Sequence, residues 1–366
     1  MKKMVFSLLL LGIFVAAVGC ASAPEEEQVV ETPEPLVIEI EPEEEPVEVE
    51  VVEELLNENL LTGLPTLTDE AVGKRPMAVM ISNVQASMPQ YGIGAADLIF
   101  EIPAEGGATR LMALYGDYTQ VPLIAPVRSA RLYFTSFAAG YDAFYAHWGN
   151  MGEIEAGVSG NLGSGRFNGA VNTGGLFGRD QGRLAAGYPM EHASTFDGPG
   201  LVDAVANLGL RADLEGNIAP AFLFHPLGEI IAPSDESAFR VVVDFNGTTA
   251  TLVYDEESQI YLKSFNGNPH IDGITNEQLS FTNVLVLETP ISVNSIGHNE
   301  MNVDGGEAST GYYISGGAVQ RITWRRDSGN QLGELRFFDA DNGEEIYVNR
   351  GRTYIAVNRG GSTSFE

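Results

Sequence analysis

Met77-Ala78-Val79-Met80-Ile81 is a run of five apolar residues, and two further strongly apolar stretches follow it, Asp97-Leu98-Ile99-Phe100-Glu101 and Leu111-Met112-Ala113-Leu114-Tyr115. Each has the length of a strand and is short for a helix, so all three predict buried β-strands. Residues 131–141 suit a short helix, and residues 143–148 suit another strand. Strands and helices that alternate in this way predict a mixed α/β domain, which we place at residues 59–235.

The second part of the chain, residues 236–366, has the pattern of short strands between turns. Ile322 and Trp324 alternate with polar residues, as in a strand with one buried face. Residues 337–346 predict two strands joined through Asn342-Gly343, because Asn-Gly favours the tight turn of a hairpin. We therefore expect an α+β protein, in which the mixed N-terminal domain is followed by a β-rich, antiparallel domain.

The N-terminus has the features of a secretion signal. Two lysines, Lys2 and Lys3, precede an apolar run at residues 4–18, and small residues lead to Cys20. The run is shorter than the roughly 20 residues of a spanning helix, and the arrangement resembles a bacterial lipoprotein signal peptide. We expect residues 1–19 to be removed and Cys20 to carry acyl chains such as palmitate. The alternative is an ordinary signal peptide with an unrelated cysteine. Cys20 is the only cysteine, so the chain forms no internal disulfide.

Residues 20–58 form a segment of unusual composition that predicts an extended tether. They contain 15 glutamates and five prolines, with no basic residue and no glycine, and such a segment repels itself and cannot bury a core. The alternation at residues 47–51 would also fit an edge strand added to another sheet. Residues 59–366 carry 35 acidic and 18 basic side chains. This acidic balance argues against nucleic acid as a partner.

Several stretches, in order, resemble the YerB-like lipoprotein family. Two of them are Pro126-Val127-Arg128-Ser129-Ala130-Arg131 and Asn266-Gly267-Asn268-Pro269-His270-Ile271-Asp272. The resemblance implies an envelope lipoprotein of two parts and names no activity. The sequence departs from the family pattern between His147 and His192, where residues 157–178 are rich in glycine. The other matching stretches are residues 59–65, 75–83, 96–101, 105–110, 282–284 and 322–324.

Paired arginines make the best candidate for a ligand site. Arg128 and Arg131 are three residues apart at the predicted start of a helix, and the arginine fork suits bidentate binding of a carboxylate or phosphate. The alternative is that both arginines pair internally with Glu101, Glu105 or Asp142. The full set of ligand-binding candidates is Glu101, Glu105, Arg110, Arg128, Arg131, His147, Arg179, Asp180 and His192.

Aromatic and polar residues further along extend this candidate site. His147 ends a predicted strand directly before Trp148, and ligands of open α/β sheets bind beyond strand ends. A histidine buried in the core is the alternative. We expect Arg179, Asp180 and His192, in polar loop sequence, to close over the same cleft.

No pattern predicts a metal ion, a cofactor or a catalytic residue set. His270 and Asp272 lack further ligands at a known spacing, and Asp339-Ala340-Asp341-Asn342-Gly343 fits a hairpin turn better than a calcium loop. The serines lack a nucleophile-elbow pattern.

Two main functions follow from these patterns. The first is a non-catalytic binding or regulatory lipoprotein for a cell-wall component or a wall-synthesis protein, on the extracytoplasmic face of the cell membrane. Ala21 after the cysteine also permits outer-membrane sorting in a cell with two membranes. The alternative is a wall hydrolase that uses Glu101 and Glu105 with His147 or His192. A structural linker between membrane and wall is a third possibility.

Overall fold

The computed structural model describes residues 56–149, 153–215, 222–295, 297–326 and 333–366. They belong to one compact unit, Glu53–Glu366. The predicted signal peptide, Cys20 and residues 20–55 of the predicted tether lie outside the described residues. Within the described ranges, no helix is both long and apolar enough to cross a membrane.

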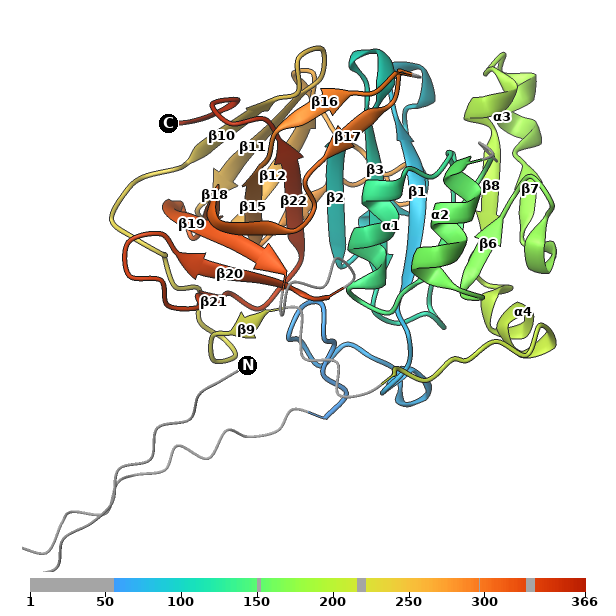
Figure 1. Ribbon diagram of the computed structural model, residues 1–366, viewed down its shortest axis with the longest axis horizontal. Helices are drawn as coiled ribbons and strands as arrows, with labels where there is room; N and C mark the ends of the chain where they lie inside the picture. The colour runs from blue at the N-terminus through green and yellow to red at the C-terminus, as the bar shows by residue number, and fades with distance from the viewer. Residues whose placement is uncertain (1–55, 150–152, 216–221, 296, 327–332) are drawn as a thin grey trace, which may run out of the picture. The chain divides into compact units, whose positions relative to one another are not determined.

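A ten-stranded sheet is the centre of the unit (Figure 1). Both sides of the expected boundary between residues 235 and 236 contribute strands to it, and β22 lies between β15 and β2. The strand order is β20 (Leu335–Asp339), β19 (Ala318–Arg326), β18 (Gly305–Ser315), β15 (Asn283–Glu288), β22 (Thr353–Asn358), β2 (Leu98–Pro103), β3 (Thr109–Tyr115), β1 (Met77–Asn83), β5 (Phe144–His147) and β6 (Arg166–Asn168).

The strands β15, β22, β2, β1, β5 and β6 all point the same way. The pairs β15 with β22, β22 with β2, β1 with β5, and β5 with β6 are parallel. Strand β3 runs antiparallel to both β1 and β2, which gives these two strands one direction. Their carboxyl ends therefore share one edge of the sheet, which we call the carboxyl edge. Its strand-end residues are Asn83, Pro103, His147, Asn168, Glu288 and Asn358.

A second sheet is antiparallel throughout and comes from the C-terminal part. Its order is β13 (Asn268–Pro269), β12 (Ile260–Phe265), β11 (Thr249–Asp255), β10 (Arg240–Asp244) and β23 (Thr363–Phe365), and β14 (Ser280–Phe281) also pairs with β12. Three smaller sheets are β16 (Ile291–Val293) with β17 (Asn299–Met301), β21 (Tyr347–Val348) with β9 (Leu223–Phe224), and β4 (Leu123–Ile124), β8 (Ser194–Asp197) and β7 (Phe177–Arg179).

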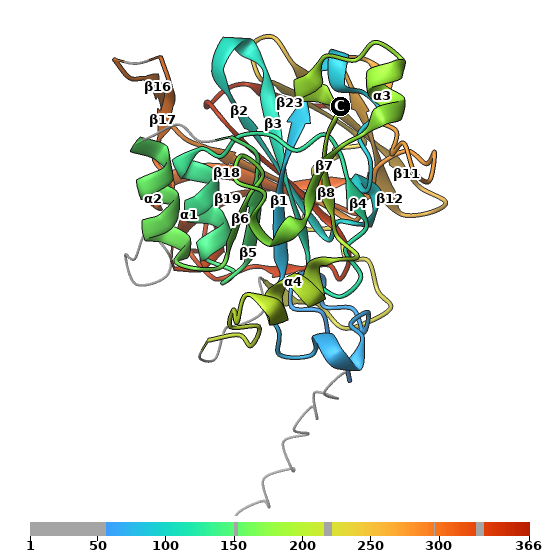
Figure 2. The ribbon, with the colours of Figure 1, turned by 90° about the vertical axis from the view of Figure 1, so that its right-hand side faces the viewer.

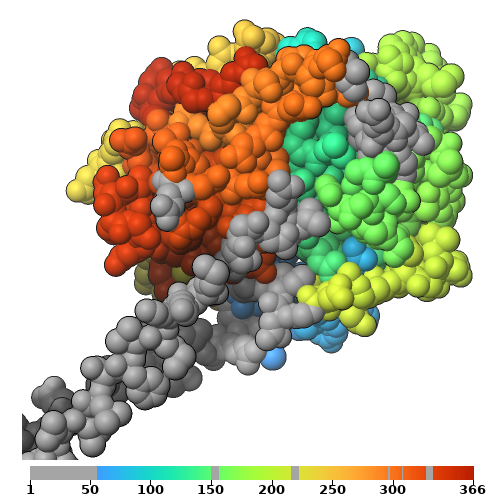
Figure 3. All heavy atoms as spheres, in the orientation of Figure 1, coloured from blue at the N-terminus to red at the C-terminus, as the bar shows by residue number. Residues whose placement is uncertain are grey.

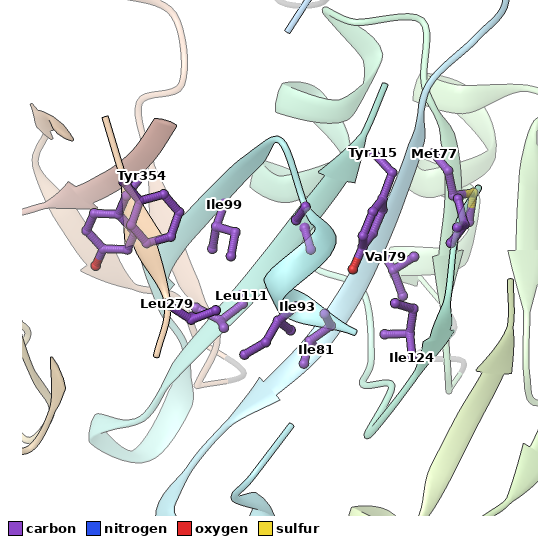
Figure 4. Close-up of a cluster of buried hydrophobic side chains, with 14 of the residues drawn as sticks. Met77, Val79, Ile81, Ile93, Ile99, Leu111, Tyr115, Ile124, Leu279 and Tyr354 are labelled. Atoms are coloured by element: carbon purple, nitrogen blue, oxygen red, sulfur yellow. The ribbon is translucent and has the colours of Figure 1, made fainter. Parts of the chain in front are cut away.

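The two faces of the ten-stranded sheet bury different partners (Figure 2). One face packs against α1 and α2 through Tyr133, Phe137 and Val158. The other packs against the antiparallel sheet and the β4–β8–β7 sheet, and Figure 4 shows part of that core, including Val79 and Leu111. Burial of each such side chain stabilises the fold by roughly 1.5–3 kcal/mol. The α-helices are α1 (Leu132–Ala139), α2 (Glu153–Leu162), α3 (Gln181–Ala185) and α4 (Leu201–Asn207).

The region at residues 59–235 is mostly β, which corrects the expected mixed α/β domain. Strands β1 to β9 lie in it, and its α-helices are short. Gly157 and Gly160, in the first part of the glycine-rich stretch, lie in α2, whereas Asn172 and Gly174 have φ values of 47° and 71° and so make left-handed turns. The 3-10 helices are η1 (Asp69–Ala71), η2 (Gln85–Ser87), η3 (Ile93–Ala95), η4 (Glu105–Gly107), η5 (Thr173–Gly175) and η6 (Met190–His192).

Several local predictions are confirmed. The three apolar stretches form β1, β2 and β3, residues 143–148 contain β5, and residues 131–141 contain α1. Ile322 and Trp324 are both 1% exposed. The turn at Asn342-Gly343 is present, but the predicted second strand is not: residues 344–346 meet β20 only through the bridge of Phe338 with Glu345 and the bond from the Ile346 amide to the Phe337 carbonyl. The C-terminal part is β-rich as predicted, although β15 and β22 pair in parallel.

Candidate ligand-binding site

Glu101 does not lie with the arginines. Its side chain is fully buried between the ten-stranded and antiparallel sheets, where Oε1 accepts hydrogen bonds from Asn83 Nδ2 and Thr109 Oγ1, both at 2.8 Å. Its Oε2 accepts from the Tyr354 hydroxyl at 2.8 Å and lies 3.0 Å from Lys263 Nζ. Lys263 is also fully buried, so this is an internal ion pair with its hydrogen bonds satisfied.

Further polar groups complete this buried network. His270 lies 3.1 Å from Lys263 Nζ through Nδ1 and 3.0 Å from Gln90 Oε1 through Nε2. Gln90 Nε2 in turn donates to Asn83 Oδ1 at 3.1 Å. Burial and the charge of Lys263 lower the pKa of His270 well below 6.5, so the imidazole is neutral. We call Asn83, Gln90, Glu101, Thr109, Lys263, His270 and Tyr354 the buried network, and its role is to join two sheets.

Glu105 lies only four residues further along but has different surroundings. Strand β2 ends at Pro103, and η4 directs the glutamate toward the start of α1. Arg131 donates to its two carboxylate oxygens, Nε to Oε1 at 2.7 Å and Nη2 to Oε2 at 2.6 Å. Burial opposes ionisation of Glu105, but the hydrogen bonds and the charge of Arg131 outweigh it and lower the pKa. Glu105 is therefore an ionised partner of Arg131, as the internal-pairing alternative expected for that arginine.

Arg110 and Arg128 keep a positive charge near this pair. Arg110 Nη1 donates to the Ser129 carbonyl at 2.9 Å, while its Nη2 lies 3.8 Å from Glu105 Oε2. Burial and repulsion by Arg131 lower the pKa of Arg110 to about 10, so it stays charged at neutral pH. Arg128 Nη1 donates to the Glu191 carbonyl at 3.3 Å, and burial lowers its pKa. Glu105 thus accepts two hydrogen bonds from Arg131, whereas Arg110 approaches it only at the longer distance.

Tyr145 is a member of this region that the sequence patterns did not single out. It is fully buried, and its hydroxyl has no hydrogen-bond partner within the described residues. Burial raises its pKa well above 10, and the charge of Arg110 acts in the opposite direction, which places the two groups near each other. Alternation along β5 puts Tyr145 on the same face as His147, and this alternation could have identified it.

The remaining candidates lie at the ends of three elements: His147 ends β5, Arg179 ends β7 and His192 ends η6. His147 is 1% exposed, and its Nδ1 lies 3.1 Å from the Gly149 carbonyl. The Arg179 guanidinium lies 3.9 Å from the centre of the Trp148 ring and donates to the Met190 carbonyl. His192 is 7% exposed, and burial followed by the charge of Arg128 lowers its pKa.

Asp180 has a structural role. Its Oδ1 accepts from the Arg183 amide at 3.1 Å and so caps α3. The Arg183 side chain donates to the carbonyls of Ser87 and His192, which ties α3 to two loops. The structure thus brings together Glu105, Arg110, Arg128 and Arg131, with His147, Arg179 and His192 beside them. We call Glu105, Arg110, Arg128, Arg131 and Tyr145 the arginine site.

The arginine site lies where ligands of such sheets are commonly held, at strand carboxyl ends and a helix start. Arg128 lies beside the middle of β1, since its amide donates to the Met80 carbonyl, and next to the carboxyl end of β5, since its own carbonyl accepts from the Trp148 amide. Arg110, Arg128, Arg131 and Arg179, set against Glu105 and Glu191, leave a local positive charge on an otherwise acidic protein. Such a site can bind a carboxylate or a phosphate. Among the described residues, no cluster of potential metal ligands is found.

Two family models match the chain in succession. Residues 61–208 match "Protein of unknown function (DUF3048) N-terminal domain", and residues 241–355 match the C-terminal domain of the same family. The chain belongs to the DUF3048 family. This agrees with the resemblance to YerB-like proteins. The family description assigns no activity.

Two similar proteins support the assignment to the DUF3048 family. The chain is 26% identical over 307 residues to "Putative lipoprotein YerB" of Bacillus subtilis (strain 168), which covers 81% of this chain and 85% of that protein. The crystal structure of YerB from Bacillus subtilis has a TM-score of 0.70 at 24% identity and covers 84% of this chain and 98% of that one. The second likeness establishes a shared fold.

Proposed function

We propose that this chain is a lipid-anchored envelope protein that binds a carboxylate-bearing component of the cell wall at the arginine site without transforming it. The proposed anchor is Cys20, on the extracytoplasmic face of the cell membrane, and the description of the relative as a lipoprotein agrees with it. Peptides of the cell wall carry free carboxylates, which match the chemistry of the site.

The observation that carries the proposal is that Glu105 is much closer to Arg131 than to Arg110. Arg131 takes both of its oxygens at 2.7 and 2.6 Å, while Arg110 reaches it only at 3.8 Å. A ligand carboxylate would give Arg110 the close charged partner that Glu105 gives to Arg131, and would add a second carboxylate beside Arg128, which Glu191 already influences. Such charge-assisted hydrogen bonds each contribute about 1.5–3 kcal/mol.

The same geometry argues against the hydrolase alternative. A glycosidase needs one carboxylic acid that holds a proton at neutral pH and a second carboxylate facing the same bond. The pKa of Glu105 is lowered rather than raised, and Glu101 is enclosed in the buried network. Neither glutamate is therefore placed to act as a general acid on a bound glycan.

The test is a titration of the full mature chain, carrying Cys20→Ser to prevent lipidation, with the tetrapeptide released from purified cell wall. Arg110→Ala with Arg128→Ala should weaken binding by at least tenfold, about 1.4 kcal/mol. A charge-matched control, Arg240→Ala with Arg321→Ala, should bind like the unchanged protein, because Arg240 pairs with Glu366 and Arg321 is exposed on β19.

Three outcomes would count against the proposal. If the control variant Arg240→Ala with Arg321→Ala lost as much tetrapeptide affinity, binding would depend on overall charge and not on the arginine site. Failure of the unchanged protein to bind the tetrapeptide, together with capture of a wall-synthesis protein that the double variant does not capture, would replace the wall component by a protein partner. Release of a cleaved product during long incubation would show catalysis. Thermal unfolding of each variant checks that it is folded.

A further inference from the structure

Two hollows lie on the carboxyl edge beyond the arginine site. The larger, about 590 Å³, is at the ends of β15 and β22 and is lined by Glu288, Thr310, Trp324 and Arg359 among others. The smaller, about 430 Å³, is at the ends of β22 and β2. Ile291 and Arg359 line both, so the hollows are neighbours. Both volumes are in the range of small-molecule sites.

The smaller hollow has a polar lining that is rich in hydrogen-bond acceptors. Pro103, Gly106, Asp244, Asn299 and Asn358 all line it. The Asn299 Nδ2 donates to the Pro103 carbonyl at 3.2 Å, and the Asn358 Nδ2 donates to the Asp244 carbonyl at 2.8 Å. Each bond uses one of the two N–H groups of its amide, so each asparagine keeps one N–H donor and its amide oxygen. A Cβ at Gly106 would meet nothing within 4 Å, so this wall is open. The lining can therefore both donate to and accept from a ligand with several polar groups, such as hydroxyls and amides.

The larger hollow is shaped by glycine around Trp324. Gly305 has φ +66°, and a Cβ there would lie 2.7 Å from the Trp324 ring and closer still to its carbonyl. The Glu288 carboxylate is already used, since it accepts from Thr310 Oγ1 at 2.6 Å and from the Gly361 amide at 2.9 Å. Arg359, which is exposed, donates through Nη2 to the Ile291 carbonyl at 3.1 Å. Arg359 thus offers further donor groups at the junction of the hollows.

The smaller hollow is connected to the arginine site through a single carbonyl group. The Pro103 carbonyl accepts from the Tyr133 hydroxyl at 2.9 Å on the α1 side and from Asn299 on the β17 side. The positive charges of Arg110 and Arg131 act on Tyr133, which places the arginines near this point. The η4 turn, with Glu105 on one side and Gly106 lining the hollow, separates the two. Figure 3 shows orange atoms of the β16–β17 region at the surface beside blue-green atoms of the N-terminal part.

We propose that the two hollows form one groove for the sugar part of the ligand whose peptide carboxylate binds at the arginine site. This inference rests on the proposed function and deepens it: the ligand is a glycopeptide, and not a free peptide. Sugar hydroxyls and acetamido N–H groups donate to the asparagine oxygens, and an acetamido carbonyl accepts from Arg359. A long ligand along the strand ends would contact both regions at once, which raises affinity without a new charged contact.

The test compares two probes, the wall tetrapeptide and the same tetrapeptide joined to its disaccharide, on the full mature chain with Cys20→Ser. Val293→Trp fills the smaller hollow from a residue that is 61% exposed, and Ala308→Trp fills the larger from an exposed position. Each should weaken binding of the disaccharide-tetrapeptide by tenfold or more and change tetrapeptide binding by less than twofold. Val253→Trp, at a residue 44% exposed on β11, is the matched control and should change neither.

The outcomes separate this inference from the proposed function. Equal affinity of the unchanged protein for both probes would overturn the groove while leaving the arginine site intact. Unchanged disaccharide-tetrapeptide binding in both tryptophan variants would do the same. Absence of binding by either probe would overturn the proposed function and the groove together. Arg359→Ala adds no bulk to either hollow and should weaken binding of the disaccharide-tetrapeptide alone. It therefore tests the groove even if the tryptophan variants do not fold.

Discussion

Glu101 and Glu105 are four residues apart and have opposite surroundings. Glu101 is fully buried, with four partners on its two oxygens. Glu105 lies at the carboxyl edge, where Arg131 and Arg110 pair with it and Arg128, near Glu191, adds a third positive charge. The buried network is complete without a ligand, whereas the arginine site has positive charge in excess. The comparison teaches that a carboxylate indicates a ligand site only when the charges around it are unbalanced.

The largest expected effect is at the centre of the buried network. Lys263→Met would leave the Glu101 charge buried without its ionic partner, which should lower the free energy of unfolding by about 3–5 kcal/mol. Urea denaturation measures this loss. Arg240→Met is the control, since Arg240 pairs with Glu366 at the surface, where the side chains are 42% and 68% exposed, and its loss should cost less than about 1 kcal/mol. Similar losses in the two variants would remove the distinction between the two regions.

The second prediction separates the two regions by pH. The folded-state pKa of His270 lies well below 6.5, so below pH 6.5 the unfolded chain binds a proton that the folded protein does not. Stability should therefore fall as the pH drops from 7 to 5, by up to about 1.4 kcal/mol per pH unit from His270. His270→Gln should flatten this slope. His192→Gln should flatten it less, because the pKa of His192 is also lowered but its side chain is less enclosed.

Glu105 titrates in a lower window. Its folded-state pKa is below 4.5, so its contribution to stability is fully present above that value and is lost as the pH falls through the folded pKa. The stability curves of Glu105→Gln and of the unchanged protein should therefore differ above pH 4.5 and converge as the pH falls through the folded pKa of Glu105. If His270→Gln left the slope of unfolding free energy against pH unchanged between pH 7 and 5, His270 would not be held neutral in the buried network.

The smallest effect on stability concerns the arginine site. Glu105→Gln should lower the free energy of unfolding by about 1 kcal/mol, because Arg131 loses a charged partner that is partly exposed. The same change should strengthen tetrapeptide binding about threefold or more, since the resident carboxylate no longer competes for the arginines. Glu58→Gln is the control: Glu58 pairs with Arg350 at 2.6 Å and is similarly exposed. Weaker tetrapeptide binding in Glu105→Gln would contradict the excess of charge at this site.

The local elements could be predicted from the sequence, and the long-range partners could not. Strands β1, β2, β3 and β5 and helix α1 were evident from apolar runs and length. The separation of Glu101 from Glu105 depends on the end of β2 at Pro103 and on the φ of +74° at Gly106, which interrupts the alternation. Lys263 and Tyr354 approach Glu101 from far along the chain, and no periodic pattern encodes such contacts.

The candidate site was partly predictable for a similar reason. Arg128 and Arg131 were expected to face one anion together, and Arg131 instead binds Glu105 with both branches of its fork. The positions are local in sequence, but the choice of partner depends on where the η4 turn directs Glu105. The expected mixed α/β region is mostly β because its strands β4, β6, β7, β8 and β9, of two to four residues each, are too short to leave a periodic pattern in the sequence.

The position of β22 has a consequence for how the protein forms. Residues Thr353–Asn358 pair with β2 on one side and β15 on the other, although β2 ends at Pro103. Synthesis proceeds from the N-terminus. The backbone N–H and C=O groups on one edge of β2 and of β15 therefore stay unpaired until β22 has been made and inserts between them. Such late, non-local pairing makes folding slow and exposes the unfinished sheet to wrong partners. A chain that is truncated before β22 therefore cannot join β2 and β15 into one ten-stranded sheet.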